Sequence, residues 1–250
     1  MIYIISGVAS LFIAFLASIL GLGGSFLFIP LFTWLGMDYK VAVIPTALLL
    51  NLVSSLTAQT SYIKKDLTDK KVGLFMAAFA VVFAQLGVYL NRFLDEETLM
   101  FIFAIMVFVV AIDIVFISKP KKDEIDDNDF HVNMLLIVLA GMFSGTMSGL
   151  LGIGGGFIIM PILLLIGFPP KRAAATSSLV VFFSSASALA GHINTQNVDL
   201  RLASICVLSV IIGAKFGAIM MSEKFKPLTV RRFFGFVMML IALKFFLDSI

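Results

Sequence analysis

Two long runs of the chain carry no charged residue, and three shorter apolar segments follow each run. The runs are residues 1–37 and 132–170, which are 37 and 39 residues long. A helix needs about 20 apolar residues to cross a bilayer, so each run is too long for one crossing and slightly short for two. The shorter segments each have about the length of one crossing: 41–63, 72–91, 98–118, 173–193, 202–221 and 233–248.

A glycine cluster interrupts each charge-free run, at residues 21–24 and 152–156. Clustered glycines interrupt a helix because they lack a side chain that restricts the backbone. The pattern therefore predicts one long helix, a break and a half-helix in each run. The half-helices are expected to start at Gly24-Ser25 and Gly155-Gly156. Pro30 and Pro161 follow, and we expect them to kink or end these half-helices.

The chain also repeats itself, with an offset of 131 residues that becomes 130 after a one-residue gap. Equivalent residues before the gap include Gly23 and Gly154, Pro30 and Pro161, and Lys40 and Lys171. After the gap, Thr46 aligns with Thr176, Tyr62 with His192 and Asp69 with Asp199. This predicts a duplicated membrane unit, with halves at 1–118 and 132–250 joined by a charged cytoplasmic linker at 119–131.

Composition sets the class of protein. The chain is 60% apolar and 13% charged, whereas soluble domains average about 45–50% and about 25%. This excludes a secreted disulfide domain, a disordered protein and almost any cytosolic enzyme, and it predicts an all-α polytopic membrane protein. Cys206 is the single cysteine, so an intramolecular disulfide is excluded.

Loop charges favour one arrangement of the crossings. If each broken run enters and leaves on the same side, the basic loops at 64–71, 119–122, 171–172 and 224–232 share one side, with 13 basic residues against 4. If each run is a single crossing, no bias remains. The positive-inside rule favours the first arrangement, with those loops in the cytoplasm. Each half then has a same-side hairpin plus three crossings, which predicts two inverted repeats.

A break at membrane depth leaves backbone N–H groups without partners, which is tolerated only inside protein or beside a cavity. The start of a half-helix also carries the positive end of the helix dipole, so each break is a candidate anion site. The alternative is that the glycines merely let helices pack closely. Polar residues in the following segments are consistent with a lined cavity: Thr46, Asn51, Thr176, Ser177, Ser178, Ser184 and Ser185.

Lys215 lies inside segment 202–221 and aligns with Gln85 of the first half. An ionisable residue within a membrane segment is a candidate functional residue, here a counterion for an anion or a proton carrier. The alternative is that Lys215 snorkels to the nearby interface. Asp113 and His192 lie near segment ends. The simpler interpretation of Asp113 is a carboxylate that snorkels to the interface, and that of His192 is an interfacial histidine.

The paired sequences GLGGSFLFIP and GIGGGFIIMP, followed by AAATSS in the second half, resemble the sulfite exporter TauE/SafE family. The resemblance covers about residues 4–248. It implies a transporter of sulfur-containing anions such as sulfite or sulfonates, driven by ion gradients. The motif glycines and the Thr176-Ser177 pair carry over. Ser25 replaces a third glycine and Thr46-Ala47 replaces Thr-Ser, so the site is expected to be asymmetric.

These observations together predict a secondary transporter of small sulfur-containing anions that works by alternating access. The bilayer, a small anion and a coupling proton or sodium ion are the expected partners, and a homodimer stays open. No enzyme activity, metal, cofactor or nucleic-acid partner is expected, and the cell (cytoplasmic) membrane is the expected location. The predicted substrate-binding residues are Gly23, Gly24, Ser25, Thr46, Gln85, Gly154, Gly155, Gly156, Thr176, Ser177 and Lys215.

Three other functions remain as alternatives. An anion channel could use the same pair of half-helices and would show flux far above transporter turnover without counterflow. A receptor or scaffold would bind a ligand without moving it. An intramembrane protease is suggested weakly by Ser148 and His192, although Ser148 also serves as an ordinary small packing residue.

Overall fold

The computed structural model describes residues 2–112, 134–192 and 199–223, together with the single positions 239 and 243. All of its regular elements are helices. They are α1 (Ile2–Leu20), α2 (Ser25–Trp34), a π-helix (Tyr39–Val43), α3 (Ile44–Lys64), α4 (Lys70–Asn91), α5 (Glu96–Ile112), α6 (Met134–Leu151), α7 (Gly156–Leu165), α8 (Pro170–His192) and α9 (Leu200–Glu223).

Both charge-free runs fold as predicted, as a long helix, a glycine break and a half-helix. In the first, α1 ends at Leu20 and α2 begins at Ser25; in the second, α6 ends at Leu151 and α7 begins at Gly156. Each half-helix is 10 residues long. Pro30 and Pro161 lie inside these half-helices and do not end them.

Side-chain contacts define the directions in which the helices run. Lys40 Nζ donates to Asn91 O, 3.2 Å away, so the start of α3 lies beside the end of α4 and the two helices are antiparallel. Asn51 Nδ2 donates to Ser185 Oγ and Ser178 Oγ donates to Ser55 O, so α3 and α8 also run antiparallel.

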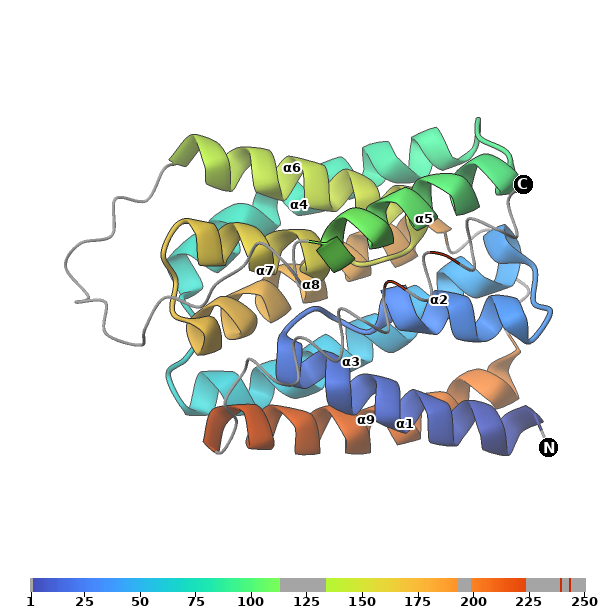
Figure 1. Cartoon of the computed structure of the whole chain (residues 1–250), viewed down its shortest axis with the longest axis horizontal. Helices are drawn as coiled ribbons and strands as arrows, with labels where there is room; N and C mark the ends of the chain where they lie inside the picture. Colours follow the sequence, from blue (N-terminus) through green and yellow to red (C-terminus); the bar gives the residue numbers. More distant parts are fainter. Residues whose placement is uncertain (1, 113–133, 193–198, 224–238, 240–242, 244–250) are drawn as a thin grey trace.

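The two long helices that precede the breaks run in opposite directions. Tyr62 OH donates to Ser18 O, which places the end of α1 beside the end of α3. His192 Nε2 lies 2.7 Å from Gly149 O, which places the end of α6 beside the end of α8. Because α3 and α8 are antiparallel, α1 and α6 are antiparallel as well (Figure 1).

Neighbours in space are often not neighbours in sequence. Helix α1 packs against α9, and α4 packs against α6. Helix α3 packs mainly against α8 and α9 rather than against α4, which follows it in the chain, and α8 packs mainly against α3 and α4. In Figure 1 the α1–α9 pair and the α4–α6 pair lie on opposite sides of α3 and α8.

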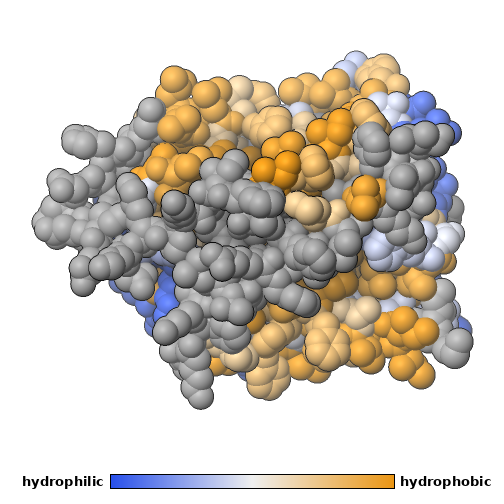
Figure 2. Space-filling view, in the orientation of Figure 1, coloured by the Kyte–Doolittle hydropathy of each residue, from blue (hydrophilic) through white to orange (hydrophobic). Residues whose placement is uncertain are grey.

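The described helices present an apolar outer surface suited to lipid. Six of them are long and apolar enough to cross a membrane: those over Tyr3–Leu20, Tyr39–Lys64, Lys70–Asn91, Met134–Leu151, Pro170–His192 and Leu200–Ser222. Figure 2 shows hydrophobic residues over the middle of the molecule and hydrophilic residues near its ends. Side chains such as Val82, Leu208 and Phe216 point outward and are more than half exposed. The protein is therefore an all-α polytopic membrane protein.

Basic residues gather at one end of the bundle. Asp69 N donates to Thr176 Oγ1 at 3.0 Å, so the 65–69 loop lies beside the start of α8. This brings Lys64, Lys65, Lys70, Lys71, Lys171 and Arg172 to the same end. The predicted segment 98–118 forms a helix over Glu96–Ile112. Segment 233–248, linker 119–131 and Asp113 lie outside the described residues apart from positions 239 and 243.

Candidate functional site

The two glycine breaks meet inside the protein. A Cβ atom added to Gly156 would overlap Leu22 O, so the start of α7 lies against the loop that precedes α2. The rings of Phe26 and Phe157, one residue into each half-helix, have centroids 6.4 Å apart. The starts of the two half-helices therefore lie together, as the repeat predicts.

Asn51 is at the centre of this meeting point. Its Oδ1 accepts hydrogen bonds from Gly24 N at 2.5 Å and Ser25 N at 3.3 Å. Its Nδ2 donates to Ser185 Oγ at 2.8 Å. One side chain on α3 thus satisfies two of the free N–H groups at the start of α2 and binds α8 at the same time. In an apolar interior each unsatisfied N–H would cost several kcal/mol.

Three serine hydroxyls bind backbone carbonyls around the breaks. Ser184 Oγ donates to Gly154 O at 2.8 Å, and Ser177 Oγ donates to Gly156 O at 3.3 Å. Ser25 Oγ, at the start of α2, donates to Ala47 O at 3.3 Å. These bonds tie the breaks to α8 and α3. We call the group formed by Gly23, Gly24, Ser25, Asn51, Gly154, Gly155, Gly156, Ser177, Ser184 and Ser185 the central cluster.

Two glycines of the central cluster are required by both space and conformation. Gly23 and Gly154 have φ angles of +70° and +69°, in the left-handed region that side chains disfavour. A Cβ at Gly23 would overlap Asn51 Oδ1, and a Cβ at Gly154 would overlap Asn51 Nδ2. Any larger residue would therefore displace the Asn51 amide.

The central cluster is closed and electrically neutral. Asn51, Ser25, Ser177, Ser184 and Ser185 are all 0% exposed. The hydrogen bonds within the central cluster join only backbone groups, hydroxyls and one amide. Such N–H and O–H donors recognise oxyanions without a fixed positive charge, and the dipole of each half-helix adds to that recognition. Because these side chains are fully buried and hydrogen-bonded to one another and to the backbone, they pack together rather than line an open cavity.

Two of the predicted site residues, Thr46 and Thr176, lie outside the central cluster, nearer the starts of α3 and α8. Thr176 Oγ1 accepts from Asp69 N in the loop before α4, near the basic end of the bundle. Thr46, its repeat equivalent on α3, is fully buried, and its hydroxyl has no hydrogen-bond partner in the described part of the chain.

Gln85 and Lys215 are not brought to the central cluster. Gln85 is exposed on α4, and its Nε2 donates to Ser187 O at 2.6 Å and Ser187 Oγ at 2.8 Å. Lys215 is exposed on α9, beside Phe216, which is 61% exposed. Gln85 thus links α4 to α8 at the outer surface of the helices.

Asn51 is among the polar residues that the sequence predicts to line a cavity, but it is not among the predicted substrate-binding residues. Its repeat equivalent, with an offset of 130, is Val181, so the polar character is not repeated in the second half. The available signal was an amide side chain in the middle of an apolar segment. Ser184 and Ser185 are also among the polar residues predicted to line a cavity, but their contacts depend on a crossing of α3 and α8 that the sequence does not specify.

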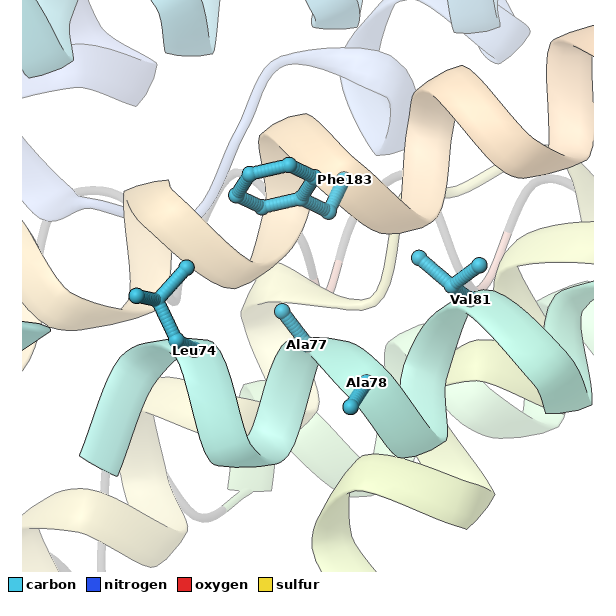
Figure 3. Close-up of a pocket in the computed structure, with 5 residues that line it drawn as sticks. All are labelled: Leu74, Ala77, Ala78, Val81 and Phe183. Carbon is cyan, nitrogen blue, oxygen red and sulfur yellow. The ribbon is translucent and has the colours of Figure 1, made fainter. Parts of the chain in front are cut away.

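A groove on the outer surface has a different character. It lies between α4 and α8, has a volume of about 230 Å³, and is lined by Leu74, Ala77, Ala78, Val81 and Phe183. Figure 3 shows four of these side chains on α4, with the Phe183 ring projecting from α8 above them. Its lining is apolar, so it does not provide the hydrogen-bond donors that an oxyanion requires.

Two comparisons with known proteins gave matches, and a third gave none. The model of the family described as sulfite exporter TauE/SafE matches residues 6–245. A protein of Methanocaldococcus jannaschii described as a probable membrane transporter protein is 28% identical over 232 residues, which cover 86% of this chain and 84% of that protein. No solved structure matches the chain significantly.

Proposed function

Because the chain belongs to the sulfite exporter TauE/SafE family, a family of membrane transporters, we propose that it carries small sulfur-containing anions such as sulfite or a sulfonate across the membrane. The observation that carries this proposal is the meeting of two half-helix starts, those of α2 and α7, in one neutral and buried cluster. Helix starts present N–H donors and the positive end of the helix dipole. Oxygen atoms of a small anion match such donors.

The anion would be bound by the backbone of the two breaks together with nearby hydroxyls. The glycines at 23, 24 and 154–156 let the anion approach the backbone, and Ser25 and Ser177 supply hydroxyl donors. Thr46 and Thr176 extend the site along α3 and α8. The fully buried Thr46 hydroxyl, which has no partner in the described residues, is available to an anion that enters from that end.

The transport cycle would be alternating access between two inverted halves, 1–118 and 132–250. The antiparallel directions of α1 and α6, and of α3 and α8, support this inverted arrangement. The central cluster is closed in the structure, so an anion reaches it only after the helices separate. A proton or sodium gradient would drive the cycle, and the basic end of the bundle would face the cytoplasm.

The test is sulfite flux into proteoliposomes, with and without imposed pH and sodium gradients. We expect saturable flux that shows counterflow and is reduced at least several-fold by Ser177→Ala. Flux far above transporter turnover without counterflow would indicate a channel. Absence of flux for sulfite, a sulfonate and a small carboxylate under every gradient would overturn the proposal.

Lys215→Met belongs in the same experiment, because the role predicted for Lys215 is separable from the rest of the site. Its exposed position on α9 leads us to expect that flux survives this substitution and that Lys215 snorkels. Loss of flux in a folded Lys215→Met protein would place Lys215 in the path of the anion.

A further inference from the structure

The apolar groove between α4 and α8 has fixed walls, because contacts between the two helices hold it at both ends. At one end, a Cβ added to Gly73 would lie 2.9 Å from Leu179 Cδ2. At the other end, Ser187 Oγ donates to Val81 O at 2.8 Å. Between these contacts, small side chains on α4 leave space in front of the Phe183 ring (Figure 3). The groove is therefore a built feature of the helix pair.

The groove also has the length of one membrane leaflet. From Leu74 to Val81 it follows α4 for seven residues, which is about 10 Å at about 1.5 Å per residue. Half of a hydrocarbon core about 30 Å thick is about 15 Å. Leu74 lies one helical turn after Lys70, at the basic end of the bundle. The groove thus runs from the membrane interface towards the middle of the bilayer, which is the path of one acyl chain.

Two lysines stand at the outer end of the groove. Lys70 lies four residues before Leu74, and this spacing places both on one face of α4. Lys71 lies seven residues before Ala78, so it also lies near that face. Both lysines are exposed. Residues 64–71 together carry four lysines against two aspartates, so an anionic group at the mouth of the groove meets net positive charge.

The second half of the chain does not keep this combination. With the offset of 130, the equivalent of Ala77 on α9 is Val207. The equivalent of Ala78 is Leu208, and that of the first lysine is Leu200. The small side chains that leave room on α4 are therefore replaced by larger ones, and one of the two positive charges is lost. The groove and its lysines belong to one end of the bundle alone.

We propose that this groove binds one acyl chain of an anionic phospholipid, whose phosphate is held by Lys70 and Lys71. A neutral lipid would match the apolar lining alone, and a free phosphate would match the lysines alone. The bound chain would also support α8 from outside, since Phe183 precedes Ser184, whose Oγ donates to Gly154 O in the central cluster. The inference goes beyond the proposed function and does not depend on which anion is transported.

Quenching of a tryptophan by lipids with brominated acyl chains tests the proposal at the groove itself. Because Trp34 is the single tryptophan, Trp34→Phe/Phe183→Trp leaves one fluorophore, in the groove. Trp34→Phe/Leu208→Trp is the matched control, since Leu208 is 64% exposed and is the repeat equivalent of Ala78. Both proteins are reconstituted in mixtures of phosphatidylglycerol and phosphatidylcholine, with either lipid brominated. The groove tryptophan should select phosphatidylglycerol by about fivefold, the effect of one nearby lysine, and the control should show no selection.

Two further pairs of variants separate the charge from the groove. Lys70→Gln/Lys71→Gln should abolish the selection, whereas Arg201→Gln should not, because Arg201 is the equivalent of Lys71 on α9, which packs against α1 and α3. Ala78→Phe fills the groove from an exposed position and should reduce quenching by both lipids several-fold. Leu86→Phe adds a ring to α4 outside the groove and should leave quenching unchanged.

Three results would overturn the inference: equal binding of the two lipids at the groove tryptophan, selection that survives in the double glutamine variant, or a groove tryptophan that neither lipid quenches, as when a second copy of the chain covers it. If Phe183→Trp does not fold, native mass spectrometry counts the phosphatidylglycerol retained by the wild type and by Ala78→Phe. One lipid fewer on the variant supports the proposal, and equal counts overturn it. Neither method measures flux, so a failure of the proposed transport would be seen separately.

Discussion

Ser25 and Ser177 make the same contact from opposite partners. Ser25 Oγ donates to Ala47 O, and Ser177 Oγ donates to Gly156 O, each at 3.3 Å. With the repeat offsets, Gly156 is the equivalent of Ser25 and Ser177 is the equivalent of Ala47. Each half therefore keeps one hydroxyl between the start of its half-helix and the next long helix, although the hydroxyl is on the half-helix in one case and on the long helix in the other.

This relationship predicts that the hydroxyl can be moved across the contact. Ser25→Gly should lower the free energy of unfolding by about 0.5–1.5 kcal/mol, the usual net value of one hydrogen bond. Adding Ala47→Ser, which copies the second half, should recover most of that loss. Thermal unfolding in detergent measures both variants. Equal stability of the single and double variants would show that a hydroxyl at position 47 cannot replace the hydroxyl of Ser25.

The glycines of the breaks and the glycines after the half-helices should respond differently to alanine. Gly154 and Gly36 both have a positive φ, but a Cβ at Gly36 would have nothing within 4 Å. Gly36→Ala should therefore cost only backbone strain, about 1–2 kcal/mol. Gly154→Ala adds a collision with Asn51 and should cost about 3 kcal/mol or more. Similar unfolding temperatures for the two variants would show that space at Gly154 is not limiting.

Tyr62 and His192 bind equivalent carbonyls at the ends of α1 and α6, those of Ser18 and Gly149. His192→Phe should leave the Gly149 carbonyl without this partner and cost about 1–3 kcal/mol. His192→Tyr supplies a hydroxyl like that of Tyr62 and should be less damaging. The unfolding temperatures of the wild type and the two variants provide the comparison. A lower unfolding temperature for His192→Tyr than for His192→Phe would show that His192 and Tyr62 do not play equivalent roles.

The start of α9 should make stability depend on pH. Hydrogen bonds from Leu202 N and Arg201 N and from the Tyr3 hydroxyl lower the pKa of Asp199 from its ordinary value of 3.8. A carboxylate with a lowered pKa in the folded state stabilises the protein above the unfolded-state pKa, and this contribution is lost as the pH falls through the folded-state pKa.

The variant Asp199→Ala should therefore unfold at a lower temperature than the wild type at pH 7, and the difference should shrink below pH 3.8. Asparagine also caps helices but does not titrate, so the difference between the Asn and Ala variants should stay constant with pH. A wild-type advantage over the Ala variant that is independent of pH would contradict this assignment.

Most of the fold could be predicted from the chain, because charge-free length and glycine clusters determine where membrane helices start, break and end. The half-helix starts at Ser25 and Gly156 agree with the predicted positions. The central role of Asn51 was not predicted, because it depends on where α3 crosses α8. The exposed positions of Gln85 and Lys215 depend in the same way on the rotation of α4 and α9, which is set by packing between helices that are distant in sequence.

The packing of α4 against α6 has a consequence for biogenesis. Helix α4 is synthesised before α6, so the face of α4 that contains Gly87 waits without the helix that it fits. Helix α1 waits longer still, because α9 is made last among the described helices. Neither half can reach its native packing alone, because α1 packs on α9 and α4 packs on α6, so this packing is completed only after α9 has been synthesised. Two separately encoded halves would need to be inserted into the same membrane at the same time.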